Sequence, residues 1–188
     1  MAEPLASTCA RMSESAVAGR HLDNIAPCVL GGLVLVRSVE PIDVVAVPLR
    51  EAWFVALATP AVRVETRAAR ALLPEQSPRE EWVAQMANTA ALLIAFAVGN
   101  EDLVRRSLDD RFAEPRRAPL VPRFGEVKAA ALGTGALGCS LSGSGPTVFA
   151  LCRDEVSARS CAEAMRGAFK PVPCTTHVGS IGDGARVE

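Results

Sequence analysis

The sequence lacks the features that mark several classes of protein. No two of its six cysteines form a C-x-x-C pair, and no metal-ligand spacing is present. The first 20 residues contain no apolar signal segment. The longest apolar run, residues 90–98, is too short to span a bilayer. The formal net charge of −1 gives no electrostatic reason to expect nucleic acid or an anionic membrane as a partner.

The composition that is present is typical of a globular protein. Hydrophobic residues make up 49% and charged residues 22% of the 188 residues, which allows a sizeable buried core. Several cysteines lie in apolar runs, as Cys152 does, and this is typical of buried free thiols in a reducing compartment. We therefore expect a soluble, cytoplasmic protein without a disulfide framework or a cysteine-ligated metal.

Hydrophobic periodicity and turn residues predict a mixture of helices and strands in the first half of the chain. The strand over residues 53–58 is apolar throughout, which predicts burial on both faces. The long helix is expected to be capped by Ser77, to have Pro78 at its first position and to lie deep, because its second half is apolar all round. The expected helices are 5–18, 24–30, 66–73 and 78–98, and the expected strands are 33–36, 44–47 and 53–58.

The second half of the chain alternates more clearly. Strands are expected over 138–141, 148–152 and 172–178, and helices over 103–112, 123–132 and 156–169. The last helix carries Ala158, Cys161, Ala162 and Met165 on its inner side. Because an adjacent pair of strands occurs among the helices, the pattern predicts an α+β sandwich rather than a doubly wound sheet.

Three segments contain residues that could bind a ligand, and the first surrounds a short helix. His21, Asp23 and Asn24 precede this helix, which ends at Gly31-Gly32. These residues have two interpretations. Asp23 and Asn24 are either a helix cap beside a surface histidine, or an acceptor and an amide presented to a small polar ligand near backbone donors.

The second segment combines hydroxyl and guanidinium groups. Thr66 and Arg70 are four residues apart at the start of a helix and therefore share one face, and Glu114-Pro115-Arg116-Arg117 follows later in the chain. An arginine and a threonine on one face can hold a carboxylate. The alternative is an ordinary solvated face, since Arg63 and Arg67 lie nearby.

The third segment is a loop of small residues between two expected strands. In Ser142-Gly143-Ser144-Gly145-Pro146-Thr147, glycines would let backbone amides approach an anion and the hydroxyls would add donors. A simple tight turn is the alternative, because Gly-Pro is a general turn signal. The loop is neither a Walker phosphate loop nor a dinucleotide fingerprint.

Together these segments resemble those of homoserine kinases, a branch of the GHMP family of small-molecule kinases. They occur in family order and cover nearly the whole chain, and the third is typical of the whole GHMP family. The matching segments are His21-x-Asp23-Asn24-x-Ala26-Pro27-x-x-x-Gly31-Gly32, Thr66-x-x-Ala69-Arg70, Glu114-Pro115-x-Arg117, residues 142–147 and Gly184-Ala185-Arg186-Val187.

The resemblance implies an enzyme that moves the γ-phosphoryl group of ATP, with Mg²⁺, to the side-chain hydroxyl of L-homoserine in threonine biosynthesis. Asp23 and then His21 are implied to polarise the reacting hydroxyl. Asn24, Thr66, Arg70 and Arg117 are implied to bind the amino acid, the last three at its carboxylate. Gly143, Ser144, Gly145 and Thr147 are implied to lie beside the phosphates. The resemblance leaves a homodimer open.

The sequence departs from this family at its amino-terminal end. Homoserine kinases open with a domain that holds a Pro-x-x-x-Gly-Leu-Gly-Ser-Ser-Ala phosphate loop, and nothing here matches it. We therefore expect a truncated form, with residues 1–50 as a remnant of the amino-terminal domain and residues 51–188 as a ferredoxin-like carboxy-terminal domain. Exposed sheet edges and apolar surface are also expected. The alternatives are a binding module that holds an amino acid without catalysis, or an unrelated α+β interaction domain.

Overall fold

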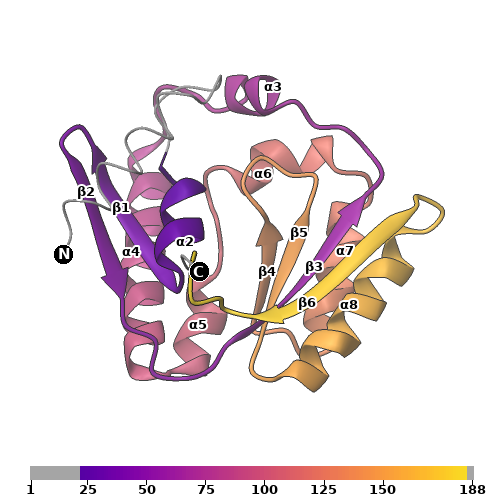
Figure 1. Cartoon of the computed structure of the whole chain (residues 1–188). Coiled ribbons are helices and arrows are strands. Elements are labelled where there is room, and N and C mark those ends of the chain that lie inside the picture. Colours follow the sequence, from indigo (N-terminus) through magenta and orange to yellow (C-terminus); the bar gives the residue numbers. More distant parts are fainter. Residues whose placement is uncertain (1–21, 186–188) are drawn as a thin grey trace. The chain divides into compact units, whose positions relative to one another are not determined.

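The chain divides into two compact units. A computed structural model describes residues 22–185, and the expected helix over residues 5–18 lies outside this range (Figure 1). The first unit comprises residues 1–50 and 181–188, and the second comprises residues 51–180. Residues 181–185 therefore group with the first unit, whereas the sequence analysis assigned them to the second domain.

The first unit contains one helix and one pair of strands. Helix α2 (Ile25–Leu30) ends at Gly31, and strands β1 (Leu33–Val39) and β2 (Ile42–Val47) pair antiparallel with an irregularity between Val36 and Ser38. These elements confirm the expected ones. Asn24 precedes the helix but its side chain makes no cap hydrogen bond, because its backbone is already in the helical region.

The carboxy-terminal tail closes the first unit against α2. The Gly32 amide donates to the Gly182 carbonyl at 2.8 Å, and the Ala185 amide donates to the Val29 carbonyl at 3.2 Å. Residues from the two ends of the chain therefore share this unit. Its small apolar cluster contains the buried residues Leu22 and Ala26 and the partly buried Ile25, Val29, Val34, Val36, Ile42 and Val44.

Gly31 allows this close approach of the tail. A Cβ atom at Gly31 would lie 2.2 Å from the backbone carbon of Asp183, and the residue has a φ of 70°. We expect Gly31→Ala to detach the tail, and hydrogen exchange at the Ala185 amide measures this loss. Gly32→Ala is the matched control, since Gly32 has a φ of 64° but an added methyl group there would meet no atom within 4 Å. The Gly32→Ala variant should lose only about 1–2 kcal/mol of stability, which is the cost of a non-glycine residue in the left-handed region. Equal exchange in both variants would contradict the steric argument.

The second unit is built on a four-stranded antiparallel sheet. Its strands are β3 (Phe54–Pro60), β4 (Gly138–Leu141), β5 (Val148–Cys152) and β6 (Cys174–Ser180), in the order β4-β5-β3-β6. Helices α7 (Phe124–Gly133) and α8 (Glu155–Phe169) lie side by side on one face of this sheet (Figure 1). This order and these crossovers are those of the ferredoxin-like split βαβ arrangement, so the expected α+β sandwich is confirmed.

The main core lies between the sheet and these two helices. In β3 the buried residues Ala56, Ala58 and Pro60 alternate with partly exposed ones. The expectation that β3 is buried on both faces is therefore wrong, because only every second residue of its later part is buried. The expected inner side of α8 is confirmed, since Ala158, Cys161, Ala162 and Met165 are all buried.

The core also holds the thiols that the sequence suggested. Cys139, Cys152 and Cys161 are buried and free, whereas Cys28 is exposed. Burial raises the pKa of Cys139 and of Cys152 to about 12, because a thiolate is poorly solvated there. These thiols therefore stay protonated and unreactive near neutral pH.

The long helix differs from its prediction. Helix α4 (Arg79–Val98) follows Pro78, whose backbone is extended, and neither Ser77 nor Pro78 provides a side-chain cap. It ends as expected at Gly99, which is left-handed. Only Ala95 and Phe96 of this helix are buried, so the expectation that it lies deep is wrong. The ring of Phe96 meets Trp53 edge-on, with centroids 5.3 Å apart.

Four short helices complete the second unit. The expected helix over 103–112 is instead α5 (Glu101–Ser107), because the Asn100 side chain accepts from the Leu103 amide and so starts the helix earlier. The others are α3 (Thr66–Ala71), α6 (Glu114–Arg117) and the 3₁₀ helix η1 (Ala118–Leu120).

A candidate ligand site around the loop 142–147

The loop between β4 and β5 is held in a compact turn. The Ser142 amide donates to the Thr147 carbonyl at 2.8 Å, and the Gly145 amide donates to the Ser142 carbonyl at 3.0 Å. Gly143 and Gly145 have φ values of 59° and 83°, which is where glycine is strongly favoured. Ser142 and Gly143 are exposed, so the tip of the loop is open to a ligand.

Hydroxyl groups connect this loop to two earlier elements. The hydroxyls of Thr147 and Thr59 lie 2.9 Å apart, which ties the end of the loop to β3. The hydroxyls of Ser144 and Thr66 lie 3.4 Å apart, which places the start of α3 beside the loop. Two pairs of residues that are 88 and 78 positions apart in sequence therefore meet near the carboxy-terminal end of β3.

Arg117 joins the loop to α3. Its Nη1 donates to the Gly143 carbonyl at 3.1 Å, and its Nε donates to the Ala69 carbonyl at 3.4 Å. Arg117 is half-buried, so its positive charge is partly shielded from water and acts more strongly at short range. The Arg117 guanidinium and the exposed loop form one polar cluster with the hydroxyl groups of Thr59 and Thr66.

Further contacts hold α6, which carries Arg117, in place. The Asp110 carboxylate accepts from the amides of Phe112 and Ala113 at 2.8 Å and of Glu114 at 3.1 Å, and so caps this short helix. Glu114 forms an ion pair with Lys128 of α7. Arg116 is paired with Glu81 of α4 at 2.7 Å, and its hydrogen bonds hold the pKa of Glu81 below the usual range.

The structure therefore brings together only part of the predicted site. Thr66, Arg117, Gly143, Ser144 and Thr147 lie in the polar cluster, with Gly145 within the loop. Arg70 follows Ala69 on α3 and is exposed. Asp23 and Asn24 belong to the first unit, and His21 lies outside the described residues.

Several supporting residues were missed by the sequence analysis. Thr59, Glu81, Asp110 and Lys128 act through the contacts described above. Thr59 and Glu81 meet partners 88 and 35 residues away, so no local spacing indicates them. Asp110 could have been recognised from the sequence, because an aspartate shortly before a helix often accepts hydrogen bonds from its first amides.

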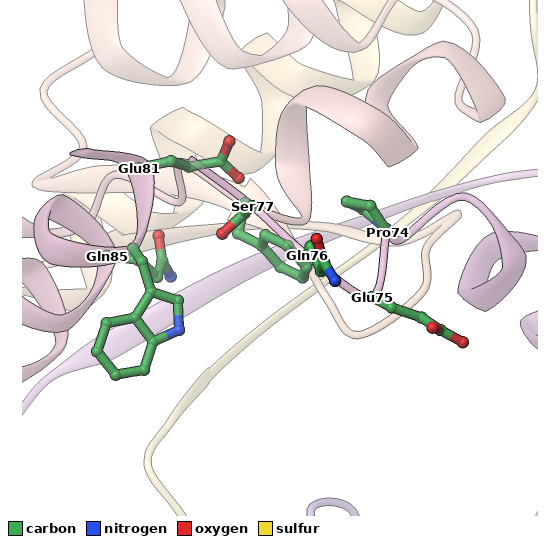
Figure 2. A pocket seen from close by; sticks show the side chains of 8 residues that line it. Pro74, Glu75, Gln76, Ser77, Glu81 and Gln85 are labelled. Atoms are coloured by element: carbon green, nitrogen blue, oxygen red, sulfur yellow. The ribbon is translucent and has the colours of Figure 1, made fainter. Parts of the chain in front are cut away.

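A separate cavity lies beside α4. It has a volume of about 510 Å³ and is bounded by residues 74–77, by the first turns of α4 and by Phe112. Figure 2 shows Glu81 and Gln85 on one side of it and Pro74 and Gln76 on the other. None of the predicted site residues lines this cavity, so it is distinct from the polar cluster.

The polar cluster has the chemistry of an anion-binding site. Glycine-rich backbone, hydroxyl groups and a guanidinium suit carboxylate or phosphate oxygens. Within residues 22–185 there is no group of three or more His, Cys, Asp or Glu side chains that could hold a metal ion.

The family model described as GHMP kinases C terminal matches residues 92–171, which include α7, the loop, both strands that flank it and α8. This part of the chain is therefore similar to the carboxy-terminal domain of GHMP kinases. The structure of the chain is similar to that of a solved homoserine kinase from Cytophaga hutchinsonii, with a TM-score of 0.85 and 40% identity over 87% of this chain and 53% of that one.

Curated proteins show the same similarity. The chain is 44% identical over 149 residues to a homoserine kinase of Chlorobium phaeovibrioides, which covers 79% of this chain and 47% of that protein. It is 38% identical over 172 residues to a homoserine kinase of Arabidopsis thaliana, which covers 90% of this chain and 46% of that protein. The resemblance to homoserine kinases is confirmed. The chain spans about half the length of these relatives.

Proposed function

We propose that the chain is the carboxy-terminal part of a homoserine kinase, which transfers the γ-phosphoryl group of ATP to the side-chain hydroxyl of L-homoserine. The observation that carries this proposal is the meeting of Thr66, Arg117 and the loop 142–147 in a chain 44% identical to such kinases. The product, O-phosphohomoserine, would serve threonine biosynthesis in the cytoplasm.

The polar cluster would bind the carboxylate and lie next to the phosphates. Thr66, Arg70 and Arg117 would hold the carboxylate of homoserine, with Arg117 fixed in position by the carbonyls of Ala69 and Gly143. Gly143, Ser144, Gly145 and Thr147 would support the nucleotide phosphates with backbone and hydroxyl donors. Phosphoryl transfer depends largely on such positioning and charge stabilisation.

The first unit would serve the reacting end of the substrate. Asn24 would bind homoserine and Asp23 would polarise its hydroxyl, with His21 as the second candidate for that role. Asp23 is exposed, as is Asn24, so both side chains are accessible to a small ligand.

ATP and Mg²⁺ would need residues that are not in this sequence. The chain contains no Pro-x-x-x-Gly-Leu-Gly-Ser-Ser-Ala segment, and residues 22–185 contain no cluster of three or more His, Cys, Asp or Glu side chains. We therefore propose that the amino-terminal half of the kinase supplies the phosphate loop and the metal ligands. The present chain contributes the amino-acid carboxylate site and the loop 142–147.

Phosphohomoserine formation tests the proposal. The 188-residue chain and a version extended upstream with the amino-terminal half of the Cytophaga kinase are each given Mg-ATP and L-homoserine and followed by phosphorus NMR. We expect product only from the extended version. Product from the short chain would overturn the assignment of ATP binding to the other half. Saturable homoserine binding by an inactive extended protein would favour a binding module instead.

A further inference from the structure

The cavity beside α4 combines two aromatic rings with two carboxylates. Its volume of about 510 Å³ lies within the range of small-molecule sites. Trp82 and Phe112 provide apolar walls, while Glu75 and Glu81 provide negative charge. The remaining lining residues are Pro74, Gln76, Ser77 and Gln85 (Figure 2).

The charge of the cavity disfavours an anionic ligand. No lysine, arginine or histidine is among the residues that line it in the described part of the chain. Arg116 pairs with Glu81 and holds the pKa of this carboxyl below the usual range, so Glu81 stays ionised near neutral pH. Glu75 adds a second negative charge at an exposed position. The amino acid and the nucleotide of the proposed reaction both carry anionic groups, so the cavity suits neither of them.

One wall of the cavity already holds a cation. The Arg116 guanidinium donates to the two carboxylate oxygens of Glu81 at 2.7 Å and 3.1 Å. The same guanidinium lies 4.9 Å from the centroid of the Phe112 ring. A carboxylate and the face of an aromatic ring therefore stabilise this positive charge together, which is a favourable arrangement for a partly desolvated cation.

The second carboxylate and the second ring have no such partner. Within residues 22–185, the Glu75 carboxylate makes no ion pair or hydrogen bond, and the Trp82 ring contacts no other aromatic ring or cation. Trp82 is 60% exposed, so its ring is accessible from the cavity. Tryptophan is the aromatic side chain that attracts cations most strongly. This part of the cavity therefore has the groups for a second cation and lacks the cation itself.

We propose that the cavity is a second ligand site, which binds a small organic cation: an ammonium or guanidinium group on an apolar body without a carboxylate. The cationic group would pair with Glu75 and lie against the face of Trp82. The apolar body would pack on Phe112 and Pro74, which are the other apolar residues of the lining. Coulombic attraction and the ring quadrupole would both favour such a ligand over its neutral analogue.

The two tryptophans of the chain allow a direct test by NMR. Each contributes one indole N–H signal in the isotope-labelled protein, and Trp82→Phe assigns the two signals. The probe is 2-phenylethylamine, which is cationic near neutral pH. We expect the Trp82 signal to move saturably with a dissociation constant of about 1 mM, which is ordinary for a ligand of this size. The signal of Trp53, which is 2% exposed, should not move. A response that does not saturate would overturn the inference.

Two analogues of the probe test the preference for a cation. In 2-phenylethanol a hydroxyl group replaces the ammonium group on the same body, so we expect binding at least threefold weaker. In 3-phenylpropionate a carboxylate replaces it, and the Trp82 signal should not respond. Equal responses to all three compounds would show an apolar cavity without charge preference, which contradicts the proposal.

A pair of charge variants locates the cation. Glu75→Gln should weaken binding of 2-phenylethylamine at least threefold. Glu80→Gln is the matched control, because Glu80 is also exposed and precedes Glu81 but does not line the cavity. It should leave the affinity unchanged. The same loss in both variants would mean that the probe follows the general negative charge of this surface, and the site would then be wrong.

A lysine or arginine side chain from the amino-terminal half of the kinase has the same chemistry, and the extended protein distinguishes this source from a free amine. We expect the Trp82 signal to respond to 2-phenylethylamine there as it does in the 188-residue chain. Loss of the response in the extended protein would overturn the inference, because the cavity would then be filled by the protein itself.

The site goes beyond the proposed function and is tested without ATP or homoserine. Arg117→Ala removes a group of the polar cluster and should leave the affinity for 2-phenylethylamine unchanged. A threefold loss in this variant would place the probe at the polar cluster and overturn the inference. An inactive extended protein that still binds the amine would contradict the proposed function alone, whereas an active one that does not bind it would contradict only the cation site.

Discussion

Replacement of Arg117 by alanine in the extended protein is expected to weaken L-homoserine binding by about 1.5–3 kcal/mol. A guanidinium that binds a carboxylate supplies charge-assisted hydrogen bonds, and these are lost entirely in the variant. Arg117 also donates to the carbonyls of Ala69 and Gly143, so its removal frees α3 and the loop from each other. Calorimetric titration with L-homoserine, without nucleotide, measures the change.

Three further variants separate charge, geometry and general effects. Arg117→Lys keeps the charge but lacks the planar fork, so we expect an intermediate loss. Arg70→Ala should weaken binding by a similar amount if Arg70 shares the carboxylate. Arg159→Ala on α8 removes an exposed arginine that is paired with Glu155, and it should change nothing. Unchanged affinity in both Arg70→Ala and Arg117→Ala would exclude the carboxylate assignment.

The sheet of the second unit was largely predictable because its signals are local. Strands β4 and β5 are short apolar runs that flank small turn residues, and the 3.6-residue period of α8 specifies both its length and its inner side. The pairing of β3 between β5 and β6 was not available from these signals. Strand order depends on contacts between segments that are far apart in sequence.

The burial of α4 shows where periodicity fails. An apolar helix is expected to be covered, but its sequence does not say by what. In this chain one side is covered by α5 and the other is exposed at Trp82, Ile94 and Val98. The apolar composition suits a helix that is covered on both sides, whereas the described residues cover only one of them.

The candidate site was predictable as a set of residues and not as a set of contacts. The family resemblance indicated Thr66, Arg117 and the loop, while no spacing rule relates Thr66 to Ser144, which is 78 residues later. The structure adds which groups meet and what holds them there. It also shows that Arg117 is fixed through backbone carbonyls, so a part of its role is to position the loop.

Gly145→Val in the extended protein is expected to lower kcat/KM for ATP at least tenfold, which is about 1.4 kcal/mol of transition-state stabilisation. Gly145 has a φ of 83°, and a Cβ atom there would lie 3.2 Å from the Cγ2 atom of Val121, which is itself buried. A β-branched residue strongly disfavours this backbone region. The loop must therefore change shape, which displaces the hydroxyls of Ser144 and Thr147.

Two glycine variants identify the cause of such a loss. Gly143→Ala introduces a methyl group at a φ of 59° with no atom within 4 Å, so it adds a backbone cost of about 1–2 kcal/mol without a clash. Gly133→Ala at the end of α7 meets no atom within 4 Å and should leave the rate unchanged. Steady-state rates at varied ATP, with thermal unfolding of each variant, give the comparison. If Gly145→Val remains folded and retains full activity, the loop has no role beside the phosphates, because its shape would then not matter to the reaction.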